Sequence, residues 1–185
     1  MPNDDIYTGQ KTRLRAYRKD DIDAAQAFIN DPEVKRFLAP EVPFPLTRQD
    51  EEKFLDELSA FKDTYAFAIE TLEGRYIGSC GINHTDWKNR LCEVGIFIGD
   101  KSLWGKGYGT DAFGVLVRFC FEQMNLNKVK LRVYDFNERG VKSYLKLGFK
   151  HEGAMRQELF KDGQYHDILL MGLLREEWLK MQQAK

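Results

Sequence analysis

The order in which strand-like and helix-like segments alternate is the feature that most constrains the fold of this chain of 185 residues. Strand-like segments lie at 11–18, 64–71, 75–83, 91–99 and 128–134, and on both sides of the Asp162-Gly163 turn. Helix-like segments lie at 20–30, 31–38, 47–61, 109–124, 137–148 and 175–183. Tight turns join early and late strands, whereas helices connect the strands between them. We therefore expect an α/β fold of mixed α+β type, a single domain over residues 1–185, with a twisted, mixed but mostly antiparallel sheet and helices on both faces.

Composition and charge exclude several classes of protein. Hydrophobic residues make up 43% and charged residues 31% of the chain, and the formal net charge is −1, which favours a globular domain over a nucleic-acid-binding one. The polar start does not resemble a signal peptide, and no apolar run is long enough to cross a membrane. Cys80, Cys92 and Cys120 stand in apolar contexts, which indicates reduced thiols in a cytoplasmic protein. The histidines lack ligand spacing, so we expect no metal site.

Capping signals place the ends of two helices. Thr47 is followed three residues later by Asp50, which is close to a capping box and predicts a helix start. The apolar residues of that helix recur at helical spacing: Phe54, Leu55, Leu58 and Phe61. Asn137 is a typical N-cap, and Gly148 stands where a helix is expected to end.

Between the strand at 91–99 and the next helix lies LWGKGYGTDAF, residues 103–113, with three glycines at alternate positions. A glycine costs about 0.5–1 kcal/mol of backbone entropy in regular structure, so three together require a cause. Backbone N–H groups at a helix start lack internal partners, and bare glycines let an anion approach them. The loop is therefore a candidate phosphate site, with Lys106 as an added positive charge. The alternative is a tight turn in which the glycines only supply positive φ angles.

The spacing of the glycines discriminates among phosphate ligands. A nucleoside triphosphate loop needs four residues between its first glycine and Gly-Lys-Ser/Thr, which this loop lacks. A dinucleotide fold needs Gly-x-Gly-x-x-Gly and an acid after the next strand. Asp135 stands near that place, but Gly105, Gly107 and Gly109 follow a different spacing. The order of elements also offers only one clear βαβ unit, which disfavours a dinucleotide.

Three motifs in order resemble the GNAT superfamily of acetyl-CoA-dependent N-acetyltransferases: LWGKGYGTDAF, NERGVKSYLKLGF and ELFKDGQYHDILLMGLL. The resemblance runs from Lys11 to about Leu174, and it is strongest to the branch that acetylates ribosomal-protein N-termini and polyamines. The loop of this family is Gln/Arg-x-x-Gly-x-Gly/Ala. Gly107 and Gly109 match its glycines, whereas Trp104 stands at its first position.

The resemblance implies acetyl-CoA as the co-substrate. Backbone N–H groups of the loop would hold the CoA pyrophosphate, and the preceding strand would pair its backbone with the pantetheine arm. Asn137 would contact the cofactor, and Tyr144 would lie near the thioester sulfur. The cofactor-binding residues expected on this basis are Ile96, Phe97, Ile98, Trp104, Gly105, Lys106, Gly107, Tyr108, Gly109, Thr110, Asn137 and Tyr144.

Direct acetyl transfer to a primary amine through a tetrahedral intermediate needs a neutral amine, donors for the oxyanion and an acid for the leaving thiolate. The resemblance implies that Tyr144, two helical turns after Asn137 on the same face, is the acid. The alternative is a plain buried face whose hydroxyl bonds to backbone. Glu93, on a strand beside a glycine, is the expected base, directly or through water; the alternatives are a solvent-facing acid or an ion-pair partner. A backbone N–H near Phe97 or Ile98 is the expected oxyanion donor.

The acceptor is less constrained. Residues 19–60 carry eleven acidic and five basic side chains, a net charge of −6. An acidic rim would favour a cationic acceptor, such as a small amine, a polyamine or a peptide N-terminus. The alternative is that these acids form the exposed faces of two amphipathic helices. A second functional hypothesis is a non-catalytic CoA-binding regulator on the same fold. We expect neither nucleic acid nor a membrane as partner, and the last strands could supply a homodimer interface.

Overall fold

A computed structural model describes residues 5–38, 44–57 and 64–183 of the chain. The strands are β1 (Thr12–Arg15), β2 (Tyr65–Thr71), β3 (Tyr76–Asp86), β4 (Leu91–Ile98), β5 (Lys128–Tyr134), β6 (Lys150–Lys161) and β7 (Gln164–Leu174). The α-helices are α1 (Ile22–Asn30), α2 (Pro32–Lys35), α3 (Arg48–Glu57), α4 (Tyr108–Glu122), α5 (Glu138–Lys146) and α6 (Arg175–Gln183). Two short 3-10 helices are η1 (Lys19–Asp21) and η2 (Lys101–Leu103).

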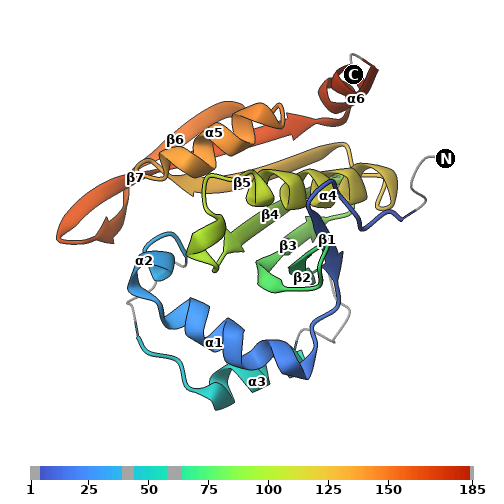
Figure 1. Cartoon of the computed structure of the whole chain (residues 1–185). Helices are drawn as coiled ribbons and strands as arrows, with labels where there is room; N and C mark the ends of the chain where they lie inside the picture. Colours follow the sequence, from blue (N-terminus) through green and yellow to red (C-terminus); the bar gives the residue numbers. More distant parts are fainter. Residues whose placement is uncertain (1–4, 39–43, 58–63, 184–185) are drawn as a thin grey trace.

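Seven strands form one sheet in the order β1-β2-β3-β4-β5-β7-β6 (Figure 1). Neighbouring strands are antiparallel except β4 and β5, which run parallel. This parallel pairing is short, because residues 91–93 pair with residues 128–130 and the rest of β4 pairs with β3 alone in the described structure. The predicted mixed, mostly antiparallel sheet is confirmed. The strands β4 and β5 separate after residue 93 of β4.

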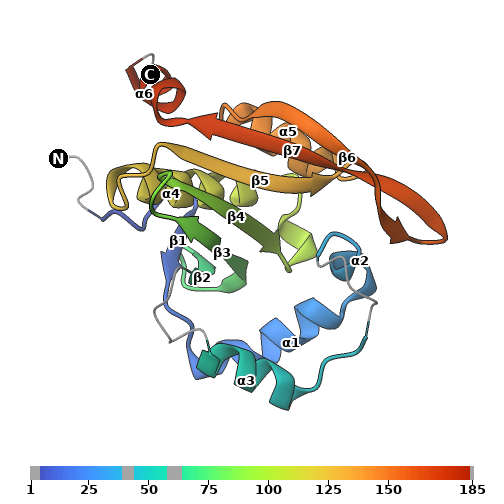
Figure 2. The ribbon, with the colours of Figure 1, turned by 180° about the vertical axis from the view of Figure 1, so that it is seen from behind.

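Helices cover both faces of the sheet, as predicted. α4 and α5 lie on the face turned toward the viewer in Figure 1 and behind the sheet in Figure 2. Two neighbouring residues of β2 mark the two sides. Ile69 belongs to the main core with Phe113 and Leu116 of α4, whereas Ala68 packs with Ala25 of α1. Successive strand residues point to opposite faces, so α1 and α4 lie on opposite sides of the sheet.

The predicted capping residues form the expected hydrogen bonds. The backbone N and Oγ1 of Thr47 donate to Asp50 Oδ2 at 2.8 and 2.7 Å, and Asp50 N donates to Thr47 Oγ1 at 3.2 Å. Asn137 Oδ1 accepts from Gly140 N at 3.0 Å at the start of α5. Gly148 follows the end of α5 with a φ of +91°, in the left-handed region. These contacts define the start of α3 and both ends of α5.

Several elements differ from their predicted bounds. β1 ends at Arg15 instead of Arg18, and β3 continues to Asp86 instead of ending at Asn83. α2 ends at Lys35, and its predicted continuation to residue 38 is a turn with i→i+3 hydrogen bonds. β6 begins at Lys150 rather than near Met155. Two register shifts opposite β7 interrupt its alternation, which removed the period-two signal from its first residues. Leu58 and Phe61, predicted on the helix that begins after Thr47, lie outside the described residues.

Gly148→Ala is expected to lower the free energy of unfolding by about 1–2 kcal/mol, because an alanine is strained at positive φ. An added Cβ would also meet Met181 Sδ at 2.5 Å. Urea unfolding of the pure protein measures the effect. The matched control is Gly153→Ala, where a Cβ meets nothing within 4 Å and the φ is not positive. Equal unfolding midpoints for the two variants would contradict the expectation.

Candidate active site

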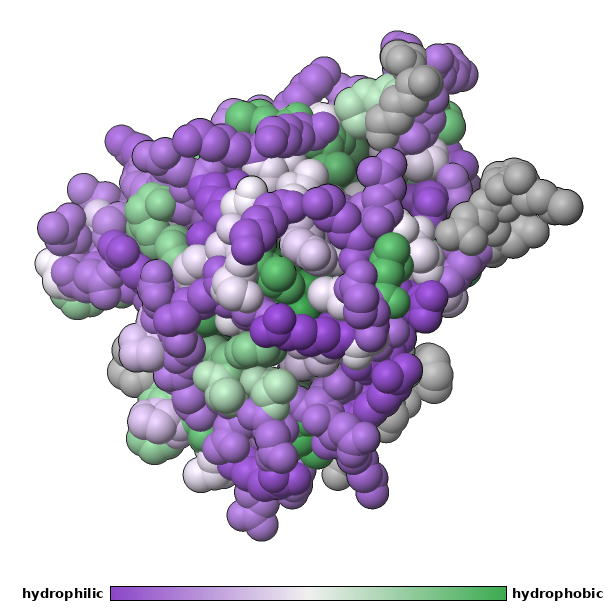
Figure 3. All heavy atoms as spheres, in the orientation of Figure 1, coloured by the Kyte–Doolittle hydropathy of each residue, from purple (hydrophilic) through white to green (hydrophobic). Residues whose placement is uncertain are grey.

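Two clefts meet where β4 leaves β5. The loop cleft, of about 490 Å³, lies between the glycine loop at 103–110 and α5, and the sheet cleft, of about 620 Å³, lies over β3, β4 and β5. Figure 3 shows hydrophobic residues in a hollow near the centre of one face, between hydrophilic rims. Five residues line both clefts: Phe37, Ile96, Phe97, Asn137 and Tyr144. Ligands in the two clefts would therefore meet at these residues.

The glycine loop has the geometry of an anion site. Gly105 and Gly107 take φ angles of +74° and +88°, in the left-handed region. Gly107 is the N-cap of α4, and no described side chain caps this end of the helix. The first amides of α4, from Tyr108 on, thus lack a side-chain partner at the positive end of the helix dipole. A phosphate bound here would accept from these amides.

Ten of the predicted cofactor-binding residues line the loop cleft: Ile96, Phe97, Ile98, Trp104, Gly105, Gly107, Gly109, Thr110, Asn137 and Tyr144. Lys106 and Tyr108 do not line it. Lys11 Nζ donates to Lys106 O at 3.2 Å and lies 5.4 Å from the centroid of the Tyr108 ring. Lys11 therefore links the outer side of the loop to the start of β1.

Trp104 and Arg139 form one wall of the loop cleft. Trp104 Nε1 donates to Ile98 O at 2.7 Å and fastens the loop to the end of β4. The Arg139 guanidinium stacks on the Trp104 ring, 3.8 Å from its centroid, and lies 5.4 Å from the centroid of the Phe37 ring. No described carboxylate forms an ion pair with Arg139, and burial lowers the pKa of its guanidinium. An exposed cation with five N–H donors at the wall of a cleft suits an anionic ligand.

Tyr144 lies at the junction of the two clefts. Its ring packs against Phe113 and Phe149, with centroids 5.0 and 6.1 Å apart. Burial raises the pKa of Tyr144 to about 12, so the phenol stays protonated near neutral pH. Asn137 caps the helix that carries Tyr144, and its Oδ1 is already engaged by the Gly140 amide. The cap thereby positions the tyrosine at the junction.

Glu93 lies on the wall of the sheet cleft and does not line the loop cleft. Its Oε1 is 3.0 Å from Arg132 Nε, and its Oε2 accepts from Arg132 Nη2 at 3.2 Å. Lys130 Nζ lies 3.7 Å from the same Oε2. The ion-pair alternative for Glu93 is thus realised in the fold, and the carboxylate nonetheless faces the cleft that Tyr144 also lines.

Sequence reasoning missed several contacts around the loop. Arg139 carried no assignment, although it lies two residues after the predicted N-cap. Thr110 Oγ1 and Ser143 Oγ lie 2.7 Å apart and join α4 to α5. The Asp111 carboxylate accepts from the backbone N–H groups of residues 10–12 and from the Thr12 hydroxyl. The position of Asp111 in the first turn of a helix is a sequence signal that could have drawn attention to it. Its partners, however, lie near the start of the chain.

Within residues 5–38, 44–57 and 64–183, no group of three or more His, Cys, Asp or Glu side chains could hold a metal ion. No helix in this described part is long and apolar enough to cross a membrane. The three cysteines are free and buried, with Cys92 Sγ and Cys120 Sγ 3.7 Å apart.

Comparison with known proteins places these features in a family. The model of the acetyltransferase (GNAT) domain family matches residues 11–150. An uncharacterized N-acetyltransferase of Bacillus licheniformis is 30% identical over 94% of this chain and 97% of its own length. The spermidine N(1)-acetyltransferase of Escherichia coli is 28% identical over 93% of this chain and 90% of its own length.

The fold is also shared with solved structures. The spermidine N-acetyltransferase of Vibrio cholerae, solved in complex with CoA and spermine, superposes with a TM-score of 0.82 at 24% identity, over 91% of this chain and 98% of that one. The family match covers well over half of the chain. The chain therefore belongs to the GNAT acetyltransferase family, as its motifs predict, and is an acetyl-CoA-dependent N-acetyltransferase.

Proposed function

We propose that the glycine loop and α5 hold acetyl-CoA in the loop cleft, and that a primary amine enters through the sheet cleft and attacks beside Tyr144. The observation that carries this proposal is the junction of the two clefts, whose shared lining includes Tyr144 and Asn137. The single seven-stranded sheet supports the further proposal that the chain is one catalytic domain.

The phosphates would be held by backbone N–H donors and by one positively charged side chain. The free amides at the start of α4 would donate to the pyrophosphate, and Arg139 would approach it from α5. Along β4, residues 96–98 have no strand partner on the side of β5 in the described structure, so their backbone is available to the pantetheine arm. Trp104 already uses the Ile98 carbonyl, which leaves the groups nearer Ile96 and Phe97 for the ligand.

Tyr144 would act as the general acid. The bound thioester supplies an activated acetyl group, and its departing sulfur needs a proton. Because burial keeps the Tyr144 phenol protonated, the hydroxyl can donate to sulfur at the junction. A backbone N–H of β4 near Phe97 or Ile98 would donate to the oxyanion. Holding both substrates at one place supplies much of the remaining acceleration.

Glu93 would accept the proton of the attacking amine, directly or through a water. Glu93→Gln is expected to lower kcat/KM for the amine only about fivefold, because Arg132 already binds the carboxylate and water can carry the proton. The Kd for CoA should not change, since Glu93 does not line the loop cleft. Steady-state rates and calorimetry measure both quantities. A raised Kd for CoA would contradict the placement of Glu93 outside the loop cleft. A hundredfold loss of rate would contradict the expectation that a water molecule can carry the proton in place of Glu93.

The test of the proposed function is release of free thiol from acetyl-CoA in the presence of a panel of amines and N-terminal peptides. Enzymatic transfer gives amine-dependent thiol and an acetylated product in the mass spectrum. The alternative, a non-catalytic CoA-binding regulator, gives calorimetric CoA binding without thiol release from any amine. Absence of CoA binding at sub-millimolar concentration would remove both functions.

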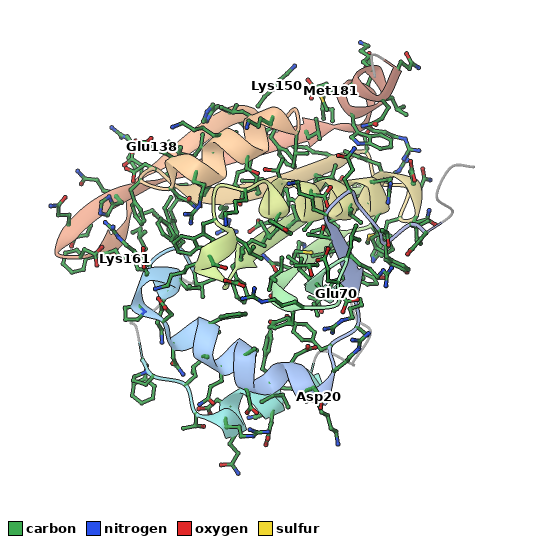
Figure 4. The ribbon with its side chains drawn as sticks, in the orientation of Figure 1. Asp20, Glu70, Glu138, Lys150, Lys161 and Met181 are labelled. Carbon is green, nitrogen blue, oxygen red and sulfur yellow. The ribbon has the colours of Figure 1, made fainter. Side chains whose placement is uncertain are left out.

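We further propose that the chain works in the cytoplasm as a homodimer through its last strands. The buried free cysteines support a reducing compartment. The β6–β7 hairpin projects beyond the sheet in both ribbon views, with Lys161 near its tip (Figure 4). Its exposed rings, Phe160 and Tyr165, lie 5.0 Å apart and are 60% and 65% exposed. Sedimentation of the wild type and of Phe160→Ser tests whether this tip lies in the interface.

A further inference from the structure

We infer that the acceptor is an amine whose only positive charge is the reacting nitrogen and whose body is apolar or aromatic, and that polyamines are poor acceptors. This inference rests on the proposed function and concerns the walls of the sheet cleft. Aromatic side chains from several separate segments line it, among them Tyr17, Phe37, Phe54, Tyr65 and Phe97. Such walls offer contact area and ring faces rather than counter-charges.

The charged lining of the sheet cleft is already balanced. Glu93 is the one carboxylate among the described residues that line it, and Arg132 lines it as well. The Arg132 guanidinium reaches both oxygens of Glu93, and Lys130 Nζ lies 3.7 Å from one of them. Arg132 thus balances Glu93 on this wall, and Lys130 adds a positive charge beside the pair, so the described lining carries no excess negative charge for a second ammonium group.

The acids of residues 19–60 are engaged elsewhere. None of the described ones lines either cleft. Most bind basic or capping groups: Asp21 to Arg15, Asp31 and Glu33 to Lys101, Asp23 and Glu52 to Arg48, Asp50 to Thr47, and Glu57 to Lys53. Glu51 is buried on α3, and burial raises the pKa of its carboxyl, which favours the neutral acid. The net charge of this segment therefore does not indicate the charge of the described cleft lining.

A polyamine carries further ammonium groups a few bonds from the reacting nitrogen. In the described sheet cleft these groups would meet aromatic faces and Arg132 instead of a free carboxylate, so cation–π contact would offset only part of their lost hydration. The apolar part of a single-charge amine would pack against the same aromatic side chains without this cost of lost hydration. Two sources share this chemistry: a free arylalkylamine, and the terminal amine of a peptide that begins with an apolar residue.

The experiment compares kcat/KM at saturating acetyl-CoA for three acceptors: 2-phenylethylamine, spermidine and phenylalanyl-alanine amide, whose terminal amine is its one ionisable group. We expect at least one single-charge amine to exceed spermidine by about tenfold or more, and the ratio of phenylethylamine to the dipeptide amide separates the two sources. A spermidine value equal to or above both others overturns the inference and leaves the proposed function intact. Absence of thiol release with all three acceptors overturns the proposed function and the inference with it.

A matched pair of variants tests the cause. Arg132→Gln leaves Glu93 with less counter-charge and should raise the ratio of spermidine to phenylethylamine kcat/KM about tenfold. Lys180→Gln removes the same charge from exposed α6, where Lys180 pairs with Glu176, and should leave the ratio unchanged. Lys130→Gln removes the other cation beside Glu93 and provides a second substitution if Arg132→Gln unfolds. An unchanged ratio in a folded variant of either residue overturns the charge argument, as does an equal rise in Lys180→Gln.

Discussion

Tyr144→Phe is expected to lower kcat by about a hundredfold and to leave the Kd for CoA within a factor of two of the wild type, because a positioned general acid contributes about 10²–10⁴ to rate. The substitution removes the hydroxyl at the junction of the clefts and keeps the ring. The packing of that ring against Phe113 and Phe149 is retained, so the variant should fold. Single-turnover acetyl transfer, followed by released thiol, isolates the chemical step from product release.

The pH dependence of kcat/KM identifies which group titrates, the Tyr144 phenol or the acceptor amine. Burial raises the pKa of Tyr144 to about 12, so its phenol remains protonated across the usable pH range. Deprotonation of the acceptor amine then controls the rise of kcat/KM with pH, and the rise should keep its midpoint in Tyr144→Phe while the plateau falls. Tyr65→Phe, on the wall of the sheet cleft, is the matched control. An unchanged kcat in Tyr144→Phe would remove the acid assignment without affecting family membership.

Local patterns predicted most of the fold because they depend on neighbours in the sequence. The caps at Thr47 and Asn137 and the stop at Gly148 each involve residues a few positions apart, and each forms. The start of β6 escaped prediction because bulges opposite β7 disturb its alternation. Register shifts of this kind depend on the partner strand, which a single segment does not encode.

The sequence predicted which residues of the candidate site lie together to the extent that they share one loop or one helix. The glycine loop, Asn137 and Tyr144 fall into that class, and they line one cleft. The Arg132 partner of Glu93 was not predicted, because it comes from β5, which pairs with β4 only through tertiary structure. The described acids of residues 19–60 line neither cleft, because side-chain direction, not composition, decides which charges face a cleft.

Trp104 stands at the first position of the loop, and its ring contacts Arg139, for which we expect a large effect on CoA binding. A tryptophan cannot supply the positive charge that an arginine there would bring to a phosphate. In the fold its ring carries the Arg139 guanidinium, 3.8 Å from the centroid, and its indole N–H ties the loop to Ile98. We expect Arg139→Ala to raise the Kd for CoA about thirtyfold, since a charge-assisted hydrogen bond contributes about 1.5–3 kcal/mol.

Calorimetry with two ligands separates phosphate binding from general damage to the cleft. CoA carries the phosphates and pantetheine does not, so the penalty in Arg139→Ala should appear for CoA and vanish for pantetheine. Arg139→Lys keeps the charge but loses the planar stack on Trp104, and should fall between the wild type and the alanine variant. Lys180→Gln is the control for loss of one positive charge, because Lys180 pairs with Glu176 on α6 and lines neither cleft. Equal losses for both ligands would mean that Arg139 shapes the wall through Trp104 and Phe37 instead of binding phosphate.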